Sequence, residues 1–210
     1  MRRVLSFLLL CAAIPASVAA EPDARLRLDG SIGAASEARR VAVTVGYSLL
    51  RGSGRWDFGI GARLSAYGGD ARMYTNRDDV RGGLTSDLEI DPALFALNAS
   101  VFGGVRFGRS VSLGANLDLI GLATGPSRAI GSLKAKPESF SYFLYGTRDR
   151  GSLNSEYYVG VRLAEDFRLR AGLSHYVTNY IVSDPGSAEA RYQRFESVPF
   201  VAVEWRKRVR

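Results

Sequence analysis

The sequence contains one cysteine, Cys11, and one histidine, His175, among its 210 residues. A single cysteine excludes an intrachain disulfide framework, and a single histidine leaves no His/Cys cluster for a metal. The acidic pair Asp78-Asp79 is too small a group to predict a carboxylate metal site. We therefore expect neither a metal nor a cofactor.

Long apolar runs are missing beyond the N-terminus. The longest stretch without a charged residue is 92–105, shorter than the ~20 apolar residues that a transmembrane helix needs. Lysine is also scarce, with only Lys134, Lys136 and Lys207, and the arginines are scattered. The net charge of +7 therefore forms no basic-aromatic cluster of the kind that binds nucleic acid, and no nucleic-acid partner is expected.

The N-terminus has the features of an export signal. A basic start, Met1 to Arg3, precedes an apolar segment over 4–14 and the small residues Val18 to Ala20, which predicts a signal peptide over 1–20. Cys11 lies inside it and follows Leu10, which is too large for a lipoprotein site. The mature chain, 21–210, then has no cysteine. A closed barrel in a bilayer can replace disulfides, because every backbone group is paired around the ring.

The stretch from Phe95 to Leu119 shows the clearest pattern. Apolar side chains occupy every second position up to Phe107 and again from Val111, and 108–110 form a Gly/Arg/Ser connection. A period of two predicts strands, and two such runs around a tight turn predict an antiparallel hairpin. The alternate row is small or polar. In a soluble sandwich the apolar row would face a core, whereas in an outer-membrane barrel it would face lipid.

The same alternation recurs along the chain and predicts eight strands near the ~9–11 residues of a tilted transmembrane strand. We expect an all-β fold, an eight-stranded antiparallel up-and-down transmembrane β-barrel. Pro199 lies within the last strand, where a local irregularity is expected. The strands are predicted over 25–34, 40–50, 55–67, 95–107, 111–119, 153–163, 167–180 and 192–205.

Short connections alternate with mostly long ones. The short ones are 51–54, 108–110 and 164–166, and the long ones are 68–92 and 123–152. This asymmetry is typical of short periplasmic turns and long extracellular loops. The acidic loop 68–92 and the basic loop 123–152 are expected either to pair over the mouth or to bind a surface ligand such as lipopolysaccharide phosphate.

Large aromatic residues lie near the short-turn rim, where they are expected to form a girdle: Trp56, Phe107, Phe167 and Trp205. With the signal peptide, the strands and the loop asymmetry, this pattern resembles the small bacterial outer-membrane barrels of the OmpA transmembrane domain, OmpX and OmpW kind. The resemblance implies a Gram-negative outer-membrane location, contact with lipid and lipopolysaccharide, insertion by the barrel-assembly machinery and a monomer. Such proteins usually end on an aromatic residue. Here Trp205 is expected to act as a displaced signal, and 206–210 as a solvated basic tail.

An eight-stranded barrel leaves an interior just wide enough for side chains. Buried charges are costly unless paired, so the inward charges are expected to form an arginine–carboxylate network that blocks a continuous pore. An ion path is the alternative. The expected network consists of Asp29, Asp57, Arg63, Arg106, Asp118, Glu156, Arg162, Arg168 and Arg170.

His175 is the residue at which catalysis would be expected. The run from Ser174 to Asn179 is similar to the His-x-Ser-Asn motif of PagL-type lipid A deacylases, but Val177 stands in the serine position. Ser174 lies on the opposite strand face, and Ser197 on the next strand has no supporting spacing. No catalytic residue is therefore expected, and ligand-binding residues stay unknown.

The expected function is a structural or surface-interaction role with a filled lumen and no catalysis. Three alternatives stay open: a lipid A-modifying enzyme, a small pore or ligand-binding barrel, and a soluble lipocalin-like barrel.

Overall fold

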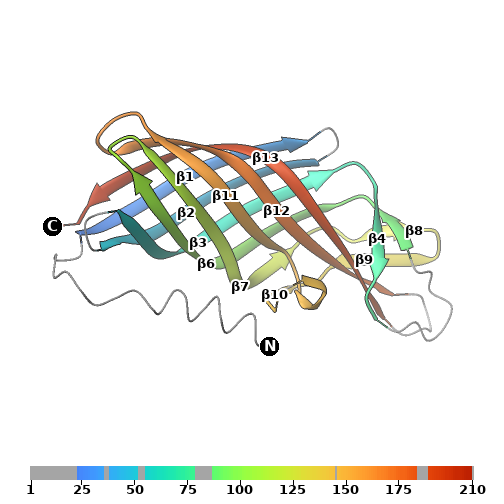
Figure 1. The fold of residues 1–210 in the computed structure, drawn as a ribbon. Coiled ribbons are helices and arrows are strands. Elements are labelled where there is room, and N and C mark those ends of the chain that lie inside the picture. The colour runs from blue at the N-terminus through green and yellow to red at the C-terminus, as the bar shows by residue number, and fades with distance from the viewer. Residues whose placement is uncertain are drawn as a thin grey trace.

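The computed structural model describes residues 23–35, 38–51, 55–78, 87–144, 146–183 and 189–209. The predicted signal peptide lies outside these ranges. The described part of the chain contains no helix long and apolar enough to cross a membrane. It is built from strands (Figure 1), of which eight are long: β1 (Asp23–Ala35), β2 (Ala38–Arg51), β3 (Trp56–Gly69), β6 (Ala93–Phe107), β7 (Val111–Thr124), β11 (Leu153–Arg162), β12 (Phe167–Ser183) and β13 (Ala190–Arg208).

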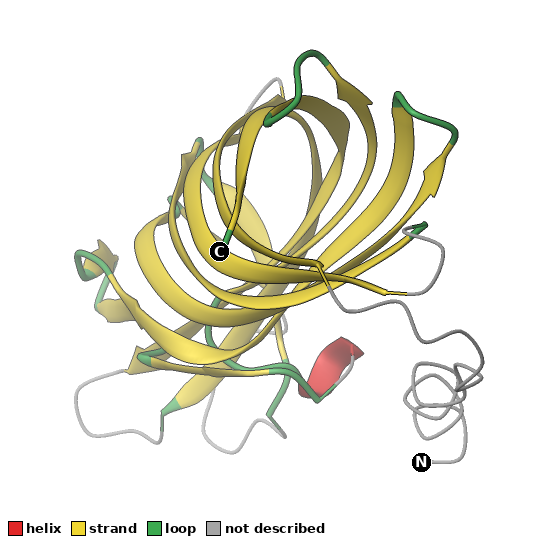
Figure 2. Cartoon of the chain, turned by 90° about the vertical axis from the view of Figure 1, so that its left-hand side faces the viewer, coloured by secondary structure: helices red, strands yellow, loops and turns green. Residues whose placement is uncertain are grey.

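The eight long strands form a closed antiparallel ring, which Figure 2 shows from its end. Each pairs with the next long strand in the chain, and β1 closes the ring on β13, with Leu28 opposite Trp205. The hairpin predicted from the Phe95–Leu119 pattern is β6–β7. Closure gives every long strand a neighbour on both sides. The predicted fold class is confirmed.

Exposure alternates along the strands in the inside-out sense. On β2, Val41 and Val43 are about half exposed, whereas Ala42 and Thr44 are buried. The exposed row is mainly apolar on every long strand and forms what we call the apolar belt. It includes Leu28, Val43, Ile60, Leu97, Leu113, Val159, Leu169 and Val203.

The long segments 68–92 and 123–152 are not simply loops. They contain the hairpins β4 (Arg72–Asn76) with β5 (Asp87–Ile90) and β8 (Arg128–Ile130) with β9 (Leu133–Pro137), the strand β10 (Phe140–Tyr142) and the 3-10 turn η1 (Gly146–Arg148). β4 pairs with β13, and β9 with β12. β12 and β13 are the longest strands, and the hairpins pair with the backbone edges that extend beyond their neighbours.

The wall position between β7 and β12 is shared by two segments. Pro137 pairs with Tyr180, and Phe140 pairs with Leu122; further toward the short turns, β11 takes over, with Ser155 opposite Leu117. Segment 143–152 is thus an insertion in one interrupted strand. Its carbonyls at Asp149 and Gly151 accept hydrogen bonds from Asn179 Nδ2 at 3.2 and 2.9 Å.

The irregularity expected at Pro199 is confined to the β1 side of β13. The β12–β13 ladder runs through Pro199 without a register shift, and pairing with β1 begins at Phe200. The proline therefore sits where β13 has no β1 partner to bond. The register shift lies in the β6–β7 ladder instead, between Ala99 and Ser100.

Candidate functional site

The half of the barrel interior nearer the short turns, which we call the turn-side half, is filled by charged side chains. Among the described residues of this half, five arginines and five carboxylates are buried, so their formal charges balance. Each carries its charge where water is excluded and needs opposite charges close by. The members are Arg27, Asp29, Arg40, Asp57, Arg63, Asp118, Glu156, Arg170, Glu204 and Arg206.

Glu156 is the hub of this charged network. Its Oε1 accepts from Arg40 Nη2 at 2.7 Å, and its Oε2 lies 3.4 Å from Arg63 Nη2. Asn116 Nδ2 donates to the same Oε2 at 2.6 Å. These partners come from β2, β3 and β7, while Glu156 is on β11. One carboxylate therefore ties four strands together across the interior.

A second group lies between β1, β12 and β13. Arg27 Nε is 2.9 Å from Asp29 and 3.1 Å from Glu204, and Arg170 reaches the same two carboxylates at 2.7 and 3.4 Å. Arg206 contacts Glu204 and Asp57. Because Asp29 and Glu204 each serve more than one arginine, the group acts as a network rather than as separate pairs.

Three inward rings pack against the guanidinium groups. Arg27 lies 4.1 Å from the centroid of Phe102, and Arg170 lies 4.6 Å from that of Tyr158. Phe200 similarly faces Arg40 at 5.5 Å. A cation over an aromatic face is favourable when both are desolvated. The rings also occupy space beside the ion pairs, so the interior is filled across its width.

Inward glycines make room for these rings. A Cβ at Gly114 would lie 2.5 Å from two atoms of the Tyr158 ring system, and one at Gly59 would lie 2.1 Å from Phe102. Packing therefore explains why the inward row contains glycines: each of these bulky inward rings lies against a residue without a side chain.

The structure brings together six of the nine charged residues that the sequence analysis assigned to the lumen. Arg106 and Arg168 are half-buried near the short turns. Arg162 is a correction, because its side chain is exposed and its Nε donates to the Ala164 carbonyl at 3.1 Å. It is the last residue of β11, where a long side chain reaches solvent. The six in the network are Asp29, Asp57, Arg63, Asp118, Glu156 and Arg170.

Four members of the network are absent from the nine expected residues: Arg27, which the alternation places on an inward row, and Arg40, Glu204 and Arg206. Arg206 was placed in a solvated tail, and this is wrong, because β13 continues to Arg208 and Arg206 lies opposite Arg27 on β1. Every second residue of β13 is buried, from Ala202 through Glu204 to Arg206. This alternation, continued past Trp205, was the signal available in the sequence.

The aromatic residues expected in a girdle lie at the short-turn rim. Trp56 begins β3, Phe107 ends β6, and Phe167 begins β12; all three are about half exposed. Trp205 pairs with Phe167 across β12 and β13. Their outward position at one end of the apolar belt is that of an interfacial girdle.

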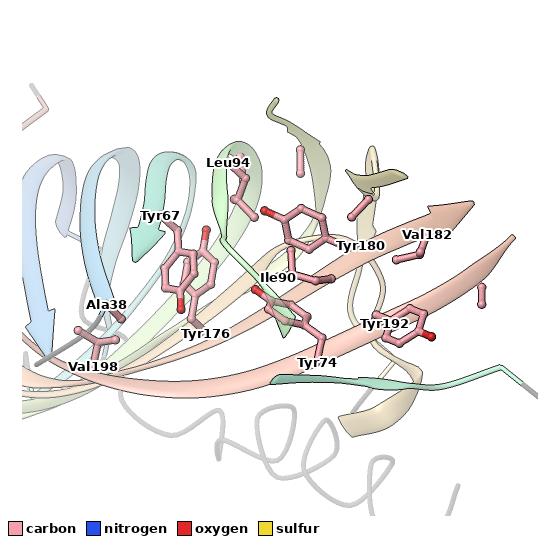
Figure 3. Packing of buried hydrophobic residues seen from close by; sticks show 14 residues of the cluster. Ala38, Tyr67, Tyr74, Ile90, Leu94, Tyr176, Tyr180, Val182, Tyr192 and Val198 are labelled. Atoms are coloured by element: carbon pink, nitrogen blue, oxygen red, sulfur yellow. The ribbon is translucent and has the colours of Figure 1, made fainter. Parts of the chain in front are cut away.

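The outer half of the interior holds a cluster of buried aromatic and apolar side chains (Figure 3). Tyr67 stacks on Tyr176 with ring centroids 4.6 Å apart, and Tyr74 meets Tyr180 edge to face at 5.4 Å. Tyr74, on the β4 hairpin, also hydrogen-bonds Thr178 Oγ1 at 2.9 Å. Burial raises the pKa of the Tyr74 phenol above its ordinary value, so the hydroxyl stays protonated. The β4 hairpin thus contributes a plug to the mouth.

Ion pairs join the two long segments to each other and to the wall. Arg128 Nη2 lies 3.3 Å from Asp91, which connects the basic segment to the acidic one. Asp78 accepts a hydrogen bond from the Arg191 backbone N–H at 2.8 Å. The two oppositely charged segments are thus in contact through an ion pair.

These features define the class. The barrel has eight strands, an apolar outward face and a charged interior, which is the arrangement of a transmembrane β-barrel and the reverse of a soluble one. No protein-family model matches the chain, and no curated protein matches it in sequence.

Solved structures with a similar arrangement include outer-membrane proteins. Neisserial surface protein A is 15% identical with a TM-score of 0.40, over 87% of this chain and 96% of that chain. The Yersinia pestis outer membrane protein Ail is 14% identical (TM-score 0.39, 89% and 100% covered). A major outer membrane protein of Thermus thermophilus is 10% identical (TM-score 0.40, 90% and 100% covered).

Proposed function

We propose that the chain is an integral protein of the bacterial outer membrane with a sealed lumen, and that its role is structural or lies at the outer surface. The observation that carries this proposal is the pair of opposite faces on each long strand. The outward row offers lipid an apolar surface, and the inward row is a charge-balanced network buried from water. An exported chain of this design is stable only where its belt is covered by lipid.

The orientation follows from the two ends of the barrel. The short turns after β2, β6 and β11 belong in the periplasm, together with the start of β1 and the end of β13. The opposite end of the barrel, which carries the β4–β5 and β8–β9 hairpins, belongs outside. Outer-leaflet lipid and lipopolysaccharide are then the contacts of the wall. The barrel-assembly machinery is the expected insertion partner, and a ring without free strand edges needs no second copy.

The outer end offers one polar hollow for a surface contact. A cavity of about 350 Å³ lies on the outside of β9 and β12. Lys134 and Lys136 line it, with Ser183 and Ile181 from β12 opposite. Glu138 and Glu189 also line the hollow, so its formal charges balance. Its two ammonium groups are the part that suits lipopolysaccharide phosphates, and this hollow is where a surface role would begin.

Conductance in a planar bilayer tests the sealed lumen. The wild type should show no stable open channel, and Asp118→Ala should leave that low baseline unchanged, because Glu156 still holds Arg63. An open porin in the same bilayer serves as the positive control. A large, long-lived conductance of the wild type would overturn the proposal in favour of a small pore.

A further inference from the structure

A polar row crosses the outward face of β11, β12 and β13. Ser155, His175 and Ser197 lie side by side in register on these three strands. His175 Nδ1 and Ser197 Oγ are 3.1 Å apart. In the tautomer that carries its proton on Nε2, the imidazole accepts the serine hydroxyl proton. A serine bonded to a histidine in this way is the arrangement of an activated nucleophile.

The row lies at the outer edge of the apolar belt. One position nearer the short turns, the outward residues are Tyr157, Leu173 and Pro199, and the first two are more than half exposed. One position farther out are Leu153 and Val177, which are buried. On these three strands the Ser–His pair therefore separates the lipid-facing surface from the covered outer wall.

Packing holds the imidazole in place. The ring of Phe195, also on β13, stacks on His175 with centroids 5.8 Å apart and planes inclined by 17°. Ser197 itself is exposed. The base is thus oriented while the hydroxyl stays accessible from the lipid side, which a catalytic pair needs and a buried structural hydrogen bond does not.

We propose that Ser197 and His175 form a hydrolytic site for an acyl ester of an outer-leaflet lipid. The ester groups of such lipids lie at the junction of acyl chains and headgroups, and the proposal places that junction at this row. Leu173 and Val201, both more than half exposed, supply the apolar surface along which the acyl chain lies. The ester belongs either to a glycerophospholipid or to the acylated sugars of lipopolysaccharide.

The reaction has two steps. Ser197 Oγ adds to the ester carbonyl carbon and gives its proton to His175 Nδ1; the ester C–O bond then breaks, and the leaving alcohol takes that proton. Water next adds to the acyl-serine carbonyl and passes a proton to His175, the acyl–Oγ bond breaks, and Oγ recovers the proton. The products are a free fatty acid and a lipid with one new hydroxyl, and no metal or redox partner is required.

Fatty-acid release from vesicles tests the site. The full mature barrel is folded into phospholipid vesicles with or without lipopolysaccharide, and released fatty acid is measured by mass spectrometry. Ser197→Ala and His175→Ala should each lower the rate at least ~100-fold. Ser155→Ala, which removes the other serine beside His175, is the matched control and should keep the rate. Each variant must first show the heat-dependent gel mobility of a folded barrel.

A fluorophosphonate provides a second readout that does not depend on the lipid. It should label Ser197 in the wild type, and His175→Ala should abolish that label. Release from phospholipid vesicles alone assigns a glycerophospholipid ester, and release only with lipopolysaccharide assigns its acylated sugars. The proposal is overturned if Ser197→Ala hydrolyses at the wild-type rate, or if neither vesicle releases fatty acid and Ser197 stays unlabelled. Conductance is measured separately, so a failure here leaves the sealed barrel intact.

Discussion

The two halves of the barrel interior are filled by different chemistry. On the turn side, Glu156 and its partners join strands through ion pairs in a region closed to water. On the outer side, Tyr67, Tyr74 and their neighbours join strands through ring packing. Removing one partner of a buried ion pair leaves an uncompensated charge, which lowers the free energy of unfolding strongly. Removing part of an apolar side chain lowers it according to the group lost and the cavity left behind. The halves should therefore respond differently to substitution.

Glu156→Ala should give the largest effect. It leaves Arg40 and Arg63 with less opposite charge in a buried site, and removing one partner of a buried pair costs about 3–5 kcal/mol. The free energy of unfolding, measured by urea titration of the barrel in lipid vesicles, should fall by that amount. Glu156→Gln keeps the shape but not the charge, so it should recover only a minor part. A loss below ~1 kcal/mol for both, well short of the cost of breaking a buried pair, would contradict the hub role.

Gly114→Ala should have the next largest effect. The added methyl group meets the Tyr158 ring, and overpacking of this kind costs about 1–3 kcal/mol. A double-mutant cycle with Tyr158→Ala isolates the clash, because Gly114→Ala should cost little once the ring is gone. Equal costs in both backgrounds would show that the methyl group meets something other than Tyr158.

Tyr74→Phe should act locally on the aromatic half. It removes the hydrogen bond to Thr178, which is worth about 0.5–1.5 kcal/mol, and keeps the ring contact with Tyr180. Hydrogen exchange should rise at the amides of β4 and its partner residues on β13, while urea unfolding of the barrel changes little. Met73→Ala, at the exposed neighbouring position, is the control. A loss of stability of the whole barrel would show that the two halves unfold together as one cooperative unit.

Arg162→Ala should have the smallest effect. Its side chain is exposed at the rim, and surface substitutions of this kind usually change the free energy of unfolding by less than ~0.5 kcal/mol. Arg63→Ala, which removes a buried partner of Glu156 and Asp118, is the contrasting variant. Similar losses for both would mean that Arg162 joins the network after all.

The alternation of side chains was enough to predict the barrel. A period of two with an apolar row on every strand specifies which face is outside, and the turn residues set the strand order. The ends of strands were harder, since Arg206 looked like part of a basic tail and Arg162 like a lumen residue. In both cases the side chain's surroundings depend on how far a neighbouring strand extends, which the local pattern does not contain.

The Ser–His pair shows a second limit. His175 has no serine at a suitable position on its own strand, and its partner is one strand away. A hairpin centred on Gly186 places His175 opposite Ser197, because both are equally distant from that residue in the chain. The contact was therefore within reach from the sequence, but only after the register of the two strands was fixed. The hydrogen bond and the stacked Phe195 ring needed coordinates.

Thiol labelling on β2 tests the central claim most directly, namely that one face of each strand meets lipid and the other a sealed interior. The predicted mature chain has no cysteine, so Val43→Cys and Thr44→Cys each provide a single thiol. In vesicles, a lipid-soluble maleimide should label Val43→Cys and not Thr44→Cys, and a water-soluble maleimide should label neither. Rapid labelling of Thr44→Cys by the water-soluble reagent would contradict the account, because it would show an open aqueous lumen.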